Sequence, residues 1–264
     1  MGYVIIFIFG AIIGSFLNVC IYRIPLGKSI VSPRSFCLFC EKPIGWFDNV
    51  PLISFLLLKG RCRNCSRPIP IRYFLVELAT ALIGVVLLFY FSSASGLPTV
   101  PFFIYWLFAC ALITMTVIDI EHHEIPDVIS IPGIFVGIIL FTLFRLDASG
   151  KMIESFINSL LGALSGGASM LVLGVVGEWI FRKEALGGGD VKLMTMIGAF
   201  LGWKLVLLTF FLAPVFGSGV GIFMKLKFHK EIIPYGPYLS LAALISLLYG
   251  KGVLSYLFCS SIVH

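Results

Sequence analysis

The stretch YVIIFIFGAIIGSFLNVCIY, residues 3 to 22, indicates the fold class of this chain. It contains twenty consecutive residues without a charged side chain. An α-helix of about that length crosses the hydrocarbon core of a bilayer. No Lys or Arg precedes the stretch and no small-residue cleavage site follows it, so we expect a retained membrane span and not a removable signal peptide.

The composition of the whole chain agrees with a membrane protein. Of the 264 residues, 59% are hydrophobic and 12% are charged, and the mean hydropathy is +1.06. Soluble domains carry about 25% charged residues, so a water-soluble globule is excluded. Seven further apolar runs follow the first: residues 73–91, 100–118, 128–144, 156–181, 191–202, 205–223 and 238–249. We therefore predict an all-α, polytopic membrane helix bundle of about eight spans.

One soluble segment interrupts this pattern. Residues 23–72 contain nine basic side chains, six prolines and four of the seven cysteines. The predicted domains are thus a first span (1–22), a cytoplasmic loop domain (23–72) and a transmembrane core (73–264). We find no internal repeat, heptad pattern or low-complexity tract.

The basic residues predict the orientation. If the loop is cytoplasmic, alternation of the spans places fifteen Lys and Arg residues on that side and four on the other: Arg145, Lys151, Lys204 and Lys251. Basic residues concentrate in cytoplasmic loops of membrane proteins. We expect both termini outside, and the segments 119–127 and 184–192 at the cytoplasmic edge.

Two CxxC pairs lie in the loop, separated by 21 residues. Two such turns can supply a tetrahedral zinc site, and a cytosolic loop is kept reduced, which disfavours disulfides. We predict a structural zinc ion that holds the loop together and does not take part in catalysis. Redox CxxC chemistry and a metal-free loop are the alternatives. The predicted ligands are Cys37, Cys40, Cys62 and Cys65. The three other cysteines, expected to be small packed hydrophobes, are Cys20, Cys110 and Cys259.

Two aspartates lie at the ends of apolar runs and predict the chemistry. Asp119 ends the third run, and Asp190 opens the sixth after three glycines. An ionisable group at membrane depth is costly and is a functional candidate by default. Two adjacent carboxylates share one proton, which supplies a base to activate water and an acid to polarise a carbonyl. We expect the glycines to allow a close backbone approach.

Helix capping is the alternative for some of these carboxylates. Asp127 follows Pro126 and we favour an N-cap role for it, whereas Asp190 fits a cap and a catalytic role equally well. Asp119 ends a helix, where the dipole disfavours a carboxylate, so capping does not explain it. We hypothesise that Asp190 is the base and that Asp119 holds the shared proton.

Several blocks, in order along nearly the whole chain, resemble a known family. They are Gly14-Ser-Phe-Leu-Asn-Val-Cys-Ile-Tyr-Arg-Ile-Pro25, Trp46-Phe-Asp-Asn-Val-Pro51, Asp119 with Pro126-Asp127, Gly187-Gly-Gly-Asp190 with Lys192, Gly198-Ala-Phe-Leu-Gly-Trp203 and Pro234-Tyr-Gly-Pro-Tyr238. The set resembles the bifunctional type IV prepilin peptidases of bacteria, which are GxGD intramembrane aspartyl proteases.

The resemblance implies two reactions. The first is cleavage of a prepilin or pseudopilin leader after its terminal glycine, with Asp119 and Asp190 as catalytic residues. The second is N-methylation of the new N-terminal residue with S-adenosylmethionine as methyl donor. It also implies a multi-pass protein of the bacterial inner (cytoplasmic) membrane, with the active site and cysteine loop facing the cytoplasm and no nucleic-acid partner.

The methyl-transfer site has weaker sequence signals. No GxGxxG follows a strand, and Glu77 and Asn18 are polar groups inside apolar runs that need partners. Each is a candidate for a role near the cofactor or the new amine; a helix-to-helix hydrogen bond is the alternative. Three other functions stay open: a peptidase without transferase activity, a proton-coupled transporter that uses the two aspartates, and a non-enzymatic assembly protein.

Overall fold

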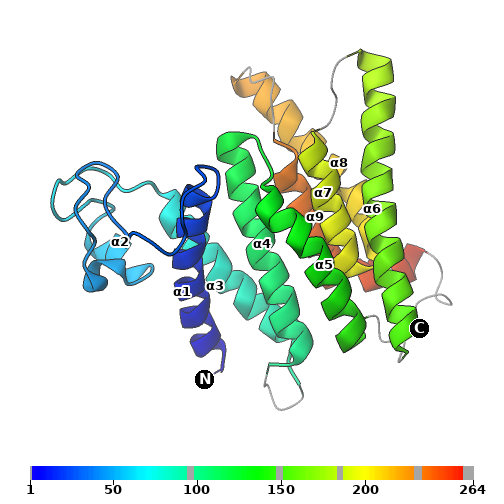
Figure 1. Cartoon of the computed structure of the whole chain (residues 1–264), viewed down its shortest axis with the longest axis horizontal. Helices are drawn as coiled ribbons and strands as arrows, with labels where there is room; N and C mark the ends of the chain where they lie inside the picture. The colour runs from blue at the N-terminus through cyan, green and yellow to red at the C-terminus, as the bar shows by residue number, and fades with distance from the viewer. Residues whose placement is uncertain (1, 94–97, 147–150, 183–186, 229–233, 258–264) are drawn as a thin grey trace. The chain divides into compact units, whose positions relative to one another are not determined.

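The computed structural model of the chain describes residues 2–93, 98–146, 151–182, 187–228 and 234–257 (Figure 1). These residues form helices joined by loops, and the β-pairing among them is limited to isolated bridges. The elements are α1 (Gly2–Arg23), η1 (Trp46–Asn49), α2 (Ile53–Leu57), α3 (Arg72–Phe91), α4 (Val100–His122), α5 (Asp127–Phe144), α6 (Met152–Phe181), α7 (Gly188–Leu201), α8 (Trp203–Phe228) and α9 (Gly236–Leu257). Each of the eight predicted apolar runs corresponds to one helix, α1 or one of α3 to α9, and the all-α prediction is confirmed.

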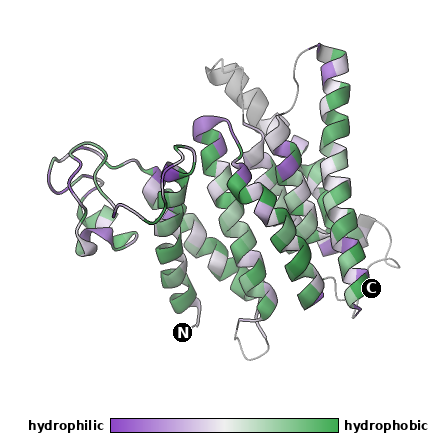
Figure 2. Ribbon diagram, in the orientation of Figure 1, coloured by the Kyte–Doolittle hydropathy of each residue, from purple (hydrophilic) through white to green (hydrophobic). Residues whose placement is uncertain are grey.

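Six of the described helices are long and apolar enough to cross a membrane: α1, α3, α4, α5, α6 and α9. These helices expose large apolar side chains; Phe135 of α5 is 63% exposed and Val175 of α6 is 66% exposed. Figure 2 shows the ribbons of α5 and α6 coloured mostly as hydrophobic. Such surfaces suit lipid and not water. The chain is therefore a multi-pass membrane protein. With only 14 residues, or about 21 Å, α7 is too short to span by itself.

The chain packs into two compact units, Met1–Thr114 and Met115–His264, and the division falls inside α4. The first unit contains the cysteine loop between α1 and α3. The second contains both predicted catalytic aspartates. This division describes packing; the functional domains at 1–22, 23–72 and 73–264 stay a prediction.

In the first unit, two glycines allow α1 to lie directly against α3. A Cβ atom at Gly14 would lie 2.6 Å from the Cα of Glu77, and one at Gly10 would lie 2.6 Å from the Cα of Ala81. The order of these contacts shows that the helices are antiparallel. The loop that joins them, residues 24–71, therefore lies at one end of the pair.

In the second unit, α7 is packed against α5, α6, α8 and α9. From Leu193 to Leu201 its side chains are buried, with Thr195 the half-buried exception. Gly162 of α6 and Gly198 of α7 bring the two backbones into contact, because a Cβ at Gly198 would lie 2.0 Å from the carbonyl oxygen of Gly162. Because successive helices run in opposite directions, the end of α4 and the starts of α5, α7 and α9 lie at the same end of this unit.

The α6–α7 contact predicts a large effect of Gly198→Val. The added side chain meets a backbone carbonyl that no rotamer change can move, so we expect the free energy of unfolding to fall by at least about 2 kcal/mol. The measurement is the unfolding midpoint of the detergent-solubilised protein. Gly252→Ala in α9 is the control, since a Cβ there meets no atom of the described residues within 4 Å; alanine should change stability by less than about 1 kcal/mol. Equal midpoints for the two variants would contradict the contact.

Candidate active site and metal centre

Asp119 is held at the end of α4 by a backbone donor from a distant part of the chain. Its side chain is buried, and its Oδ2 accepts a hydrogen bond of 2.9 Å from the N–H of Gly236, the first residue of α9. A Cβ atom on Gly236 would lie 2.6 Å from the same oxygen. The position therefore requires glycine, because any side chain would displace the carboxylate.

Asp190 lies in the first turn of α7 and is half-buried. The negative charge of Asp119 acts on its carboxyl group. Burial, together with the charge of Asp190, raises the pKa of the Tyr235 phenol to about 12. Tyr235 thus keeps its proton at neutral pH. The fold brings the two aspartates within electrostatic reach of each other, with Tyr235 and Gly236 beside them.

The glycines before Asp190 have different surroundings. A Cβ on Gly189 would lie 3.0 Å from the Cβ of Ile125, whereas one on Gly188 would meet no atom of the described residues within 4 Å. Among these residues the expected close approach is therefore seen at Gly189 and not at Gly188.

The capping role favoured for Asp127 is wrong, and capping does not explain Asp190 either. The N-cap of α5 is Pro126, with extended backbone angles, and the N-cap of α7 is Gly187; neither helix has a side-chain cap. Asp127 is the first residue of α5, and its carboxylate accepts hydrogen bonds of 2.7 and 2.8 Å from the Lys192 ammonium group. A charged partner on α7 competes successfully with the backbone N–H groups of its own helix.

The four cysteines of the loop come together as predicted. Their sulfur atoms all lie within 4.8 Å of one another, and the Sγ atoms of Cys37 and Cys65 are 3.8 Å apart. Sulfurs that bind one tetrahedral zinc ion at about 2.3 Å are about 3.8 Å from each other. The cluster can hold a metal ion. Cys20 and Cys110 are buried in helices as expected, and Cys259 lies outside the described residues.

Each CxxC pair is built in the same way. The N–H of Cys37 donates to the carbonyl of Lys42 at 3.0 Å, and the N–H of Cys62 donates to that of Arg67 at 2.9 Å. The residue after the second cysteine has a positive φ in both turns, 56° in one and 55° in the other. The prediction that the sequence has no repeat is therefore wrong, since CLFCEKPI at 37–44 and CRNCSRPI at 62–69 are two copies of one turn.

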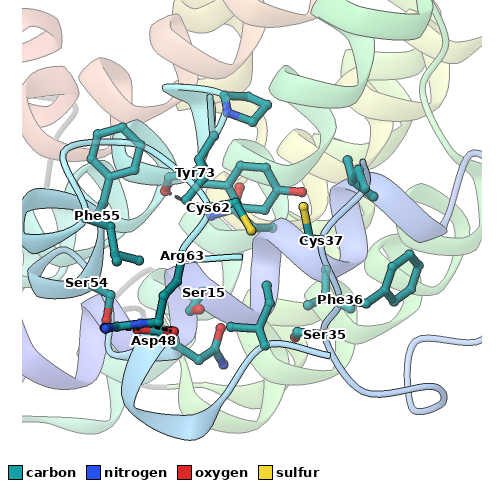
Figure 3. Close-up of a pocket in the computed structure, with 18 of the residues that line it drawn as sticks. Ser15, Ser35, Phe36, Cys37, Asp48, Ser54, Phe55, Cys62, Arg63 and Tyr73 are labelled. Carbon is teal, nitrogen blue, oxygen red and sulfur yellow. Dashed lines mark hydrogen bonds and ion pairs between the residues drawn. The ribbon is translucent and has the colours of Figure 1, made fainter. Parts of the chain in front are cut away.

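A cavity of about 650 Å³ lies between α1, the cysteine loop and the start of α3 (Figure 3). Its volume is in the range of small-molecule sites, about 300 to 1,000 Å³. An ion pair of 2.7 Å between Asp48 and Arg63 joins η1 to the second CxxC turn at its wall. Both weak sequence candidates, Asn18 and Glu77, line this cavity.

Asn18 and Glu77 make hydrogen bonds to other segments, as the alternative interpretation held. The side-chain amide of Asn18 donates to the carbonyl of Tyr73 in α3 at 3.0 Å. The Oε2 of Glu77 accepts from the N–H of Leu52 at 2.8 Å, and Ser15 of α1 also bonds to this carboxylate. The side-chain oxygen of Asn18, Oδ1, makes no hydrogen bond with the described residues.

Comparison with known proteins gives the family. Residues 8–91 match the family described as the bacterial peptidase A24 N-terminal domain, and residues 106–222 match the type IV leader peptidase family. A protein of Aeromonas hydrophila named "Prepilin leader peptidase/N-methyltransferase" is 33% identical over 280 aligned residues, covering 94% of this chain and 91% of the relative. This chain belongs to the type IV leader peptidase family.

Other members of the family carry the same name. The relative from Pseudomonas aeruginosa is 33% identical over 92% of this chain and 89% of its own length. The relative from Myxococcus xanthus is 40% identical over 84% of this chain, which spans 63% of that longer protein. No solved structure matches the chain.

The sequence analysis included Tyr235 and Gly236 only as part of the block Pro234–Tyr238 and predicted no role for either residue. The role of Gly236 was missed because a backbone donor has no side-chain signature. The place of the Tyr235 phenol near Asp190 was missed because it depends on where distant segments meet. The signal that could have indicated the Gly236 donor is the Gly-Pro pair at the start of an apolar run, where helix N–H groups are unpaired and available. The Asp127–Lys192 ion pair was missed because it joins residues 65 positions apart.

The Asp127–Lys192 pair should contribute little to stability. The side chains are 54% and 40% exposed, and exposed ion pairs contribute about 0 to 1 kcal/mol. We expect Asp127→Asn and Lys192→Gln, alone and together, each to change the free energy of unfolding by less than about 1 kcal/mol. A double-mutant cycle on the solubilised protein measures the coupling. A coupling above about 2 kcal/mol would show that this pair is a structural element of the unit.

Proposed function

We propose that this chain cleaves the leader peptide of type IV prepilins or pseudopilins and then N-methylates the new N-terminal residue. The observation that carries the proposal is that Asp119 and Asp190, on two separate helices, lie within electrostatic reach of each other at one end of the second unit. The family membership agrees with a peptidase, and the relatives' printed name supports the second reaction.

In the cleavage step the two carboxylates act as a pair. They share one proton, because two adjacent carboxylates in an apolar site do not both ionise. The ionised carboxylate takes a proton from water, and the protonated one donates to the carbonyl oxygen of the scissile bond. The neutral phenol of Tyr235 is a further donor beside Asp190.

The choice of base rests on opposing influences. Asp190 lies at a helix N-terminus and Asp119 at a C-terminus, which favours negative charge on Asp190. The Gly236 N–H, in contrast, stabilises negative charge on Asp119. We keep Asp190 as the proposed base, with the proton belonging to the coupled pair.

The substrate meets the site at the cytoplasmic face of the inner membrane in this proposal. If the helices alternate across the membrane as the sequence predicts, fifteen of the 19 basic residues lie on the side of the cysteine loop and both aspartates, which supports a cytoplasmic orientation. A prepilin presents its hydrophobic segment to the bilayer and its leader to the cytoplasm, so its scissile bond lies at the same depth as the aspartates.

Zinc is the metal we propose for the four-cysteine cluster. Four thiolates fill a tetrahedral coordination sphere, so no position is left for water or substrate, and the ion is structural. The backbone N–H groups of Cys65 and Asn64 lower the pKa of the Cys62 thiol to about 7, whereas burial and the three neighbouring sulfurs raise the pKa of Cys65 to about 11. The thiolate that binds metal is therefore favoured first at Cys62.

The cavity of the first unit is the proposed site of S-adenosylmethionine, which supplies the methyl group. Its volume suits a ligand of that size, and its aromatic lining can stack on an adenine ring and face a sulfonium cation. The aromatic residues are Phe16, Tyr22, Phe36, Phe39, Phe55 and Tyr73.

Removal of either aspartate should abolish cleavage. We expect Asp119→Asn and Asp190→Asn each to lower the rate by at least about 100-fold, because each removes one member of the acid–base pair. The assay incubates the detergent-solubilised chain with a synthetic prepilin. Asp127→Asn is the matched control, because Asp127 is an ion-paired carboxylate at the same end of the second unit as Asp119 and Asp190. Cleavage at the normal rate by Asp119→Asn or Asp190→Asn would refute the proposed peptidase mechanism.

The metal proposal predicts one zinc ion per chain by elemental analysis. Cys40→Ser and Cys62→Ser should lose it, because a three-thiolate site is open and weaker. Cys110→Ala is the control, since Cys110 is buried in α4. We expect the Cys62→Ser variant to lose methyl incorporation while it still cleaves prepilin. Zinc retained in full by both serine variants would refute the four-cysteine site.

A further inference from the structure

The cavity of the first unit contains a buried acceptor without a partner. Asn18 is 1% exposed, and its side-chain nitrogen donates to the Tyr73 carbonyl, which fixes the orientation of the amide. Its Oδ1 lies among the buried polar atoms of the described residues that make no hydrogen bond. Leaving a buried acceptor unsatisfied costs about 1 to 3 kcal/mol, so this oxygen calls for a donor from outside the chain.

A buried carboxylate lines the same cavity. Glu77 is 8% exposed, and the two groups that bond to it, the Leu52 N–H and the Ser15 hydroxyl, are both neutral. The ion pairs among the described residues do not include Glu77. Buried carboxylates are normally paired with a cation, because desolvation of an unpaired charge is costly. A cationic donor from a ligand would pair with the Glu77 carboxylate.

The helix crossing brings these two acceptors together. Gly14 lies against the backbone of Glu77, and one turn later on α1 Asn18 bonds to Tyr73, one turn earlier on α3. Asn18 and Glu77 are thus separated by about one helical turn, or about 5.4 Å along the helix axis. A single small group with several N–H donors can reach both.

We propose that Glu77 and the Oδ1 of Asn18 bind the primary ammonium group of a ligand in this cavity. An ammonium carries a positive charge for the carboxylate and three donors, one of which satisfies the amide oxygen. The inference rests on the proposed methyl transfer, where two participants carry such a group: the methionine part of the methyl donor and the new N-terminus of the cleaved substrate.

The test compares free and blocked amines by isothermal titration of the full, metal-loaded chain in detergent. One pair of probes is S-adenosylhomocysteine and its N-acetylated form. The other is a pentapeptide that begins with Phe and its N-acetylated form. Acetylation removes the charge and two donors, so we expect it to weaken binding at least tenfold in one or both pairs. The pair that responds identifies the source of the ammonium.

Glu77→Gln should reduce the effect of acetylation to less than about twofold, and Asn18→Leu should reduce it as well. The matched control is Thr80→Val in α3, a buried residue whose hydroxyl bonds to its own helix at 2.7 Å and which does not line the cavity. This control should keep the full effect. If Glu77→Gln does not fold, as judged by its unfolding midpoint, Asn18→Leu carries the comparison.

A wild-type chain that binds free and acetylated probes equally, or binds none of the probes, would overturn the proposal. So would a folded Glu77→Gln variant that keeps the tenfold difference. Prepilin cleavage and methyl incorporation are measured on the same wild-type preparation. If both reactions occur while Glu77→Gln keeps the difference, only the ammonium site fails. If neither occurs while Glu77→Gln abolishes the difference, only the proposed function fails.

Discussion

A carboxylate inside an apolar helix bundle needs a fixed donor, and for Asp119 that donor is the backbone of Gly236. The bond joins the end of α4 to the start of α9, which are 117 residues apart in the chain. It uses one of the N–H groups that every helix leaves unpaired in its first turn. The other features of the candidate active site depend on it, because it holds Asp119 where its charge acts on Asp190.

Glycine has a consistent role in both units, which is to let one backbone approach another atom that a side chain would exclude. At Gly14 the neighbour is the Cα of Glu77, at Gly198 it is a carbonyl, and at Gly236 it is a carboxylate oxygen. Helices in lipid gain little from burying apolar surface against each other, so close packing of small residues contributes much of their association. The same contacts that hold the helices together thus also position polar groups in the two sites.

Much of this architecture could be predicted from the sequence because its signals are local. The apolar runs predicted the membrane helices, and the CxxC spacing predicted the cysteine cluster. The features that could not be predicted depend on where distant segments meet. The partner of Asp127 is one such case, since local rules favoured a cap and the fold supplied Lys192. The orphaned oxygen of Asn18 is another, because only the Tyr73 contact shows which atom is left over.

The duplicated CxxC turns have a mechanical consequence for the loop. Each turn supplies two thiolates, so an ion bound to all four ties residues 37–40 to residues 62–65 and closes the chain between them into a ring. That ring includes η1 and α2, which form one wall of the cavity. Loss of one sulfur weakens the tether that restricts the whole ring, and the conformational freedom regained belongs to more than twenty residues at once. The shape of the cavity is therefore coupled to the occupancy of the metal site.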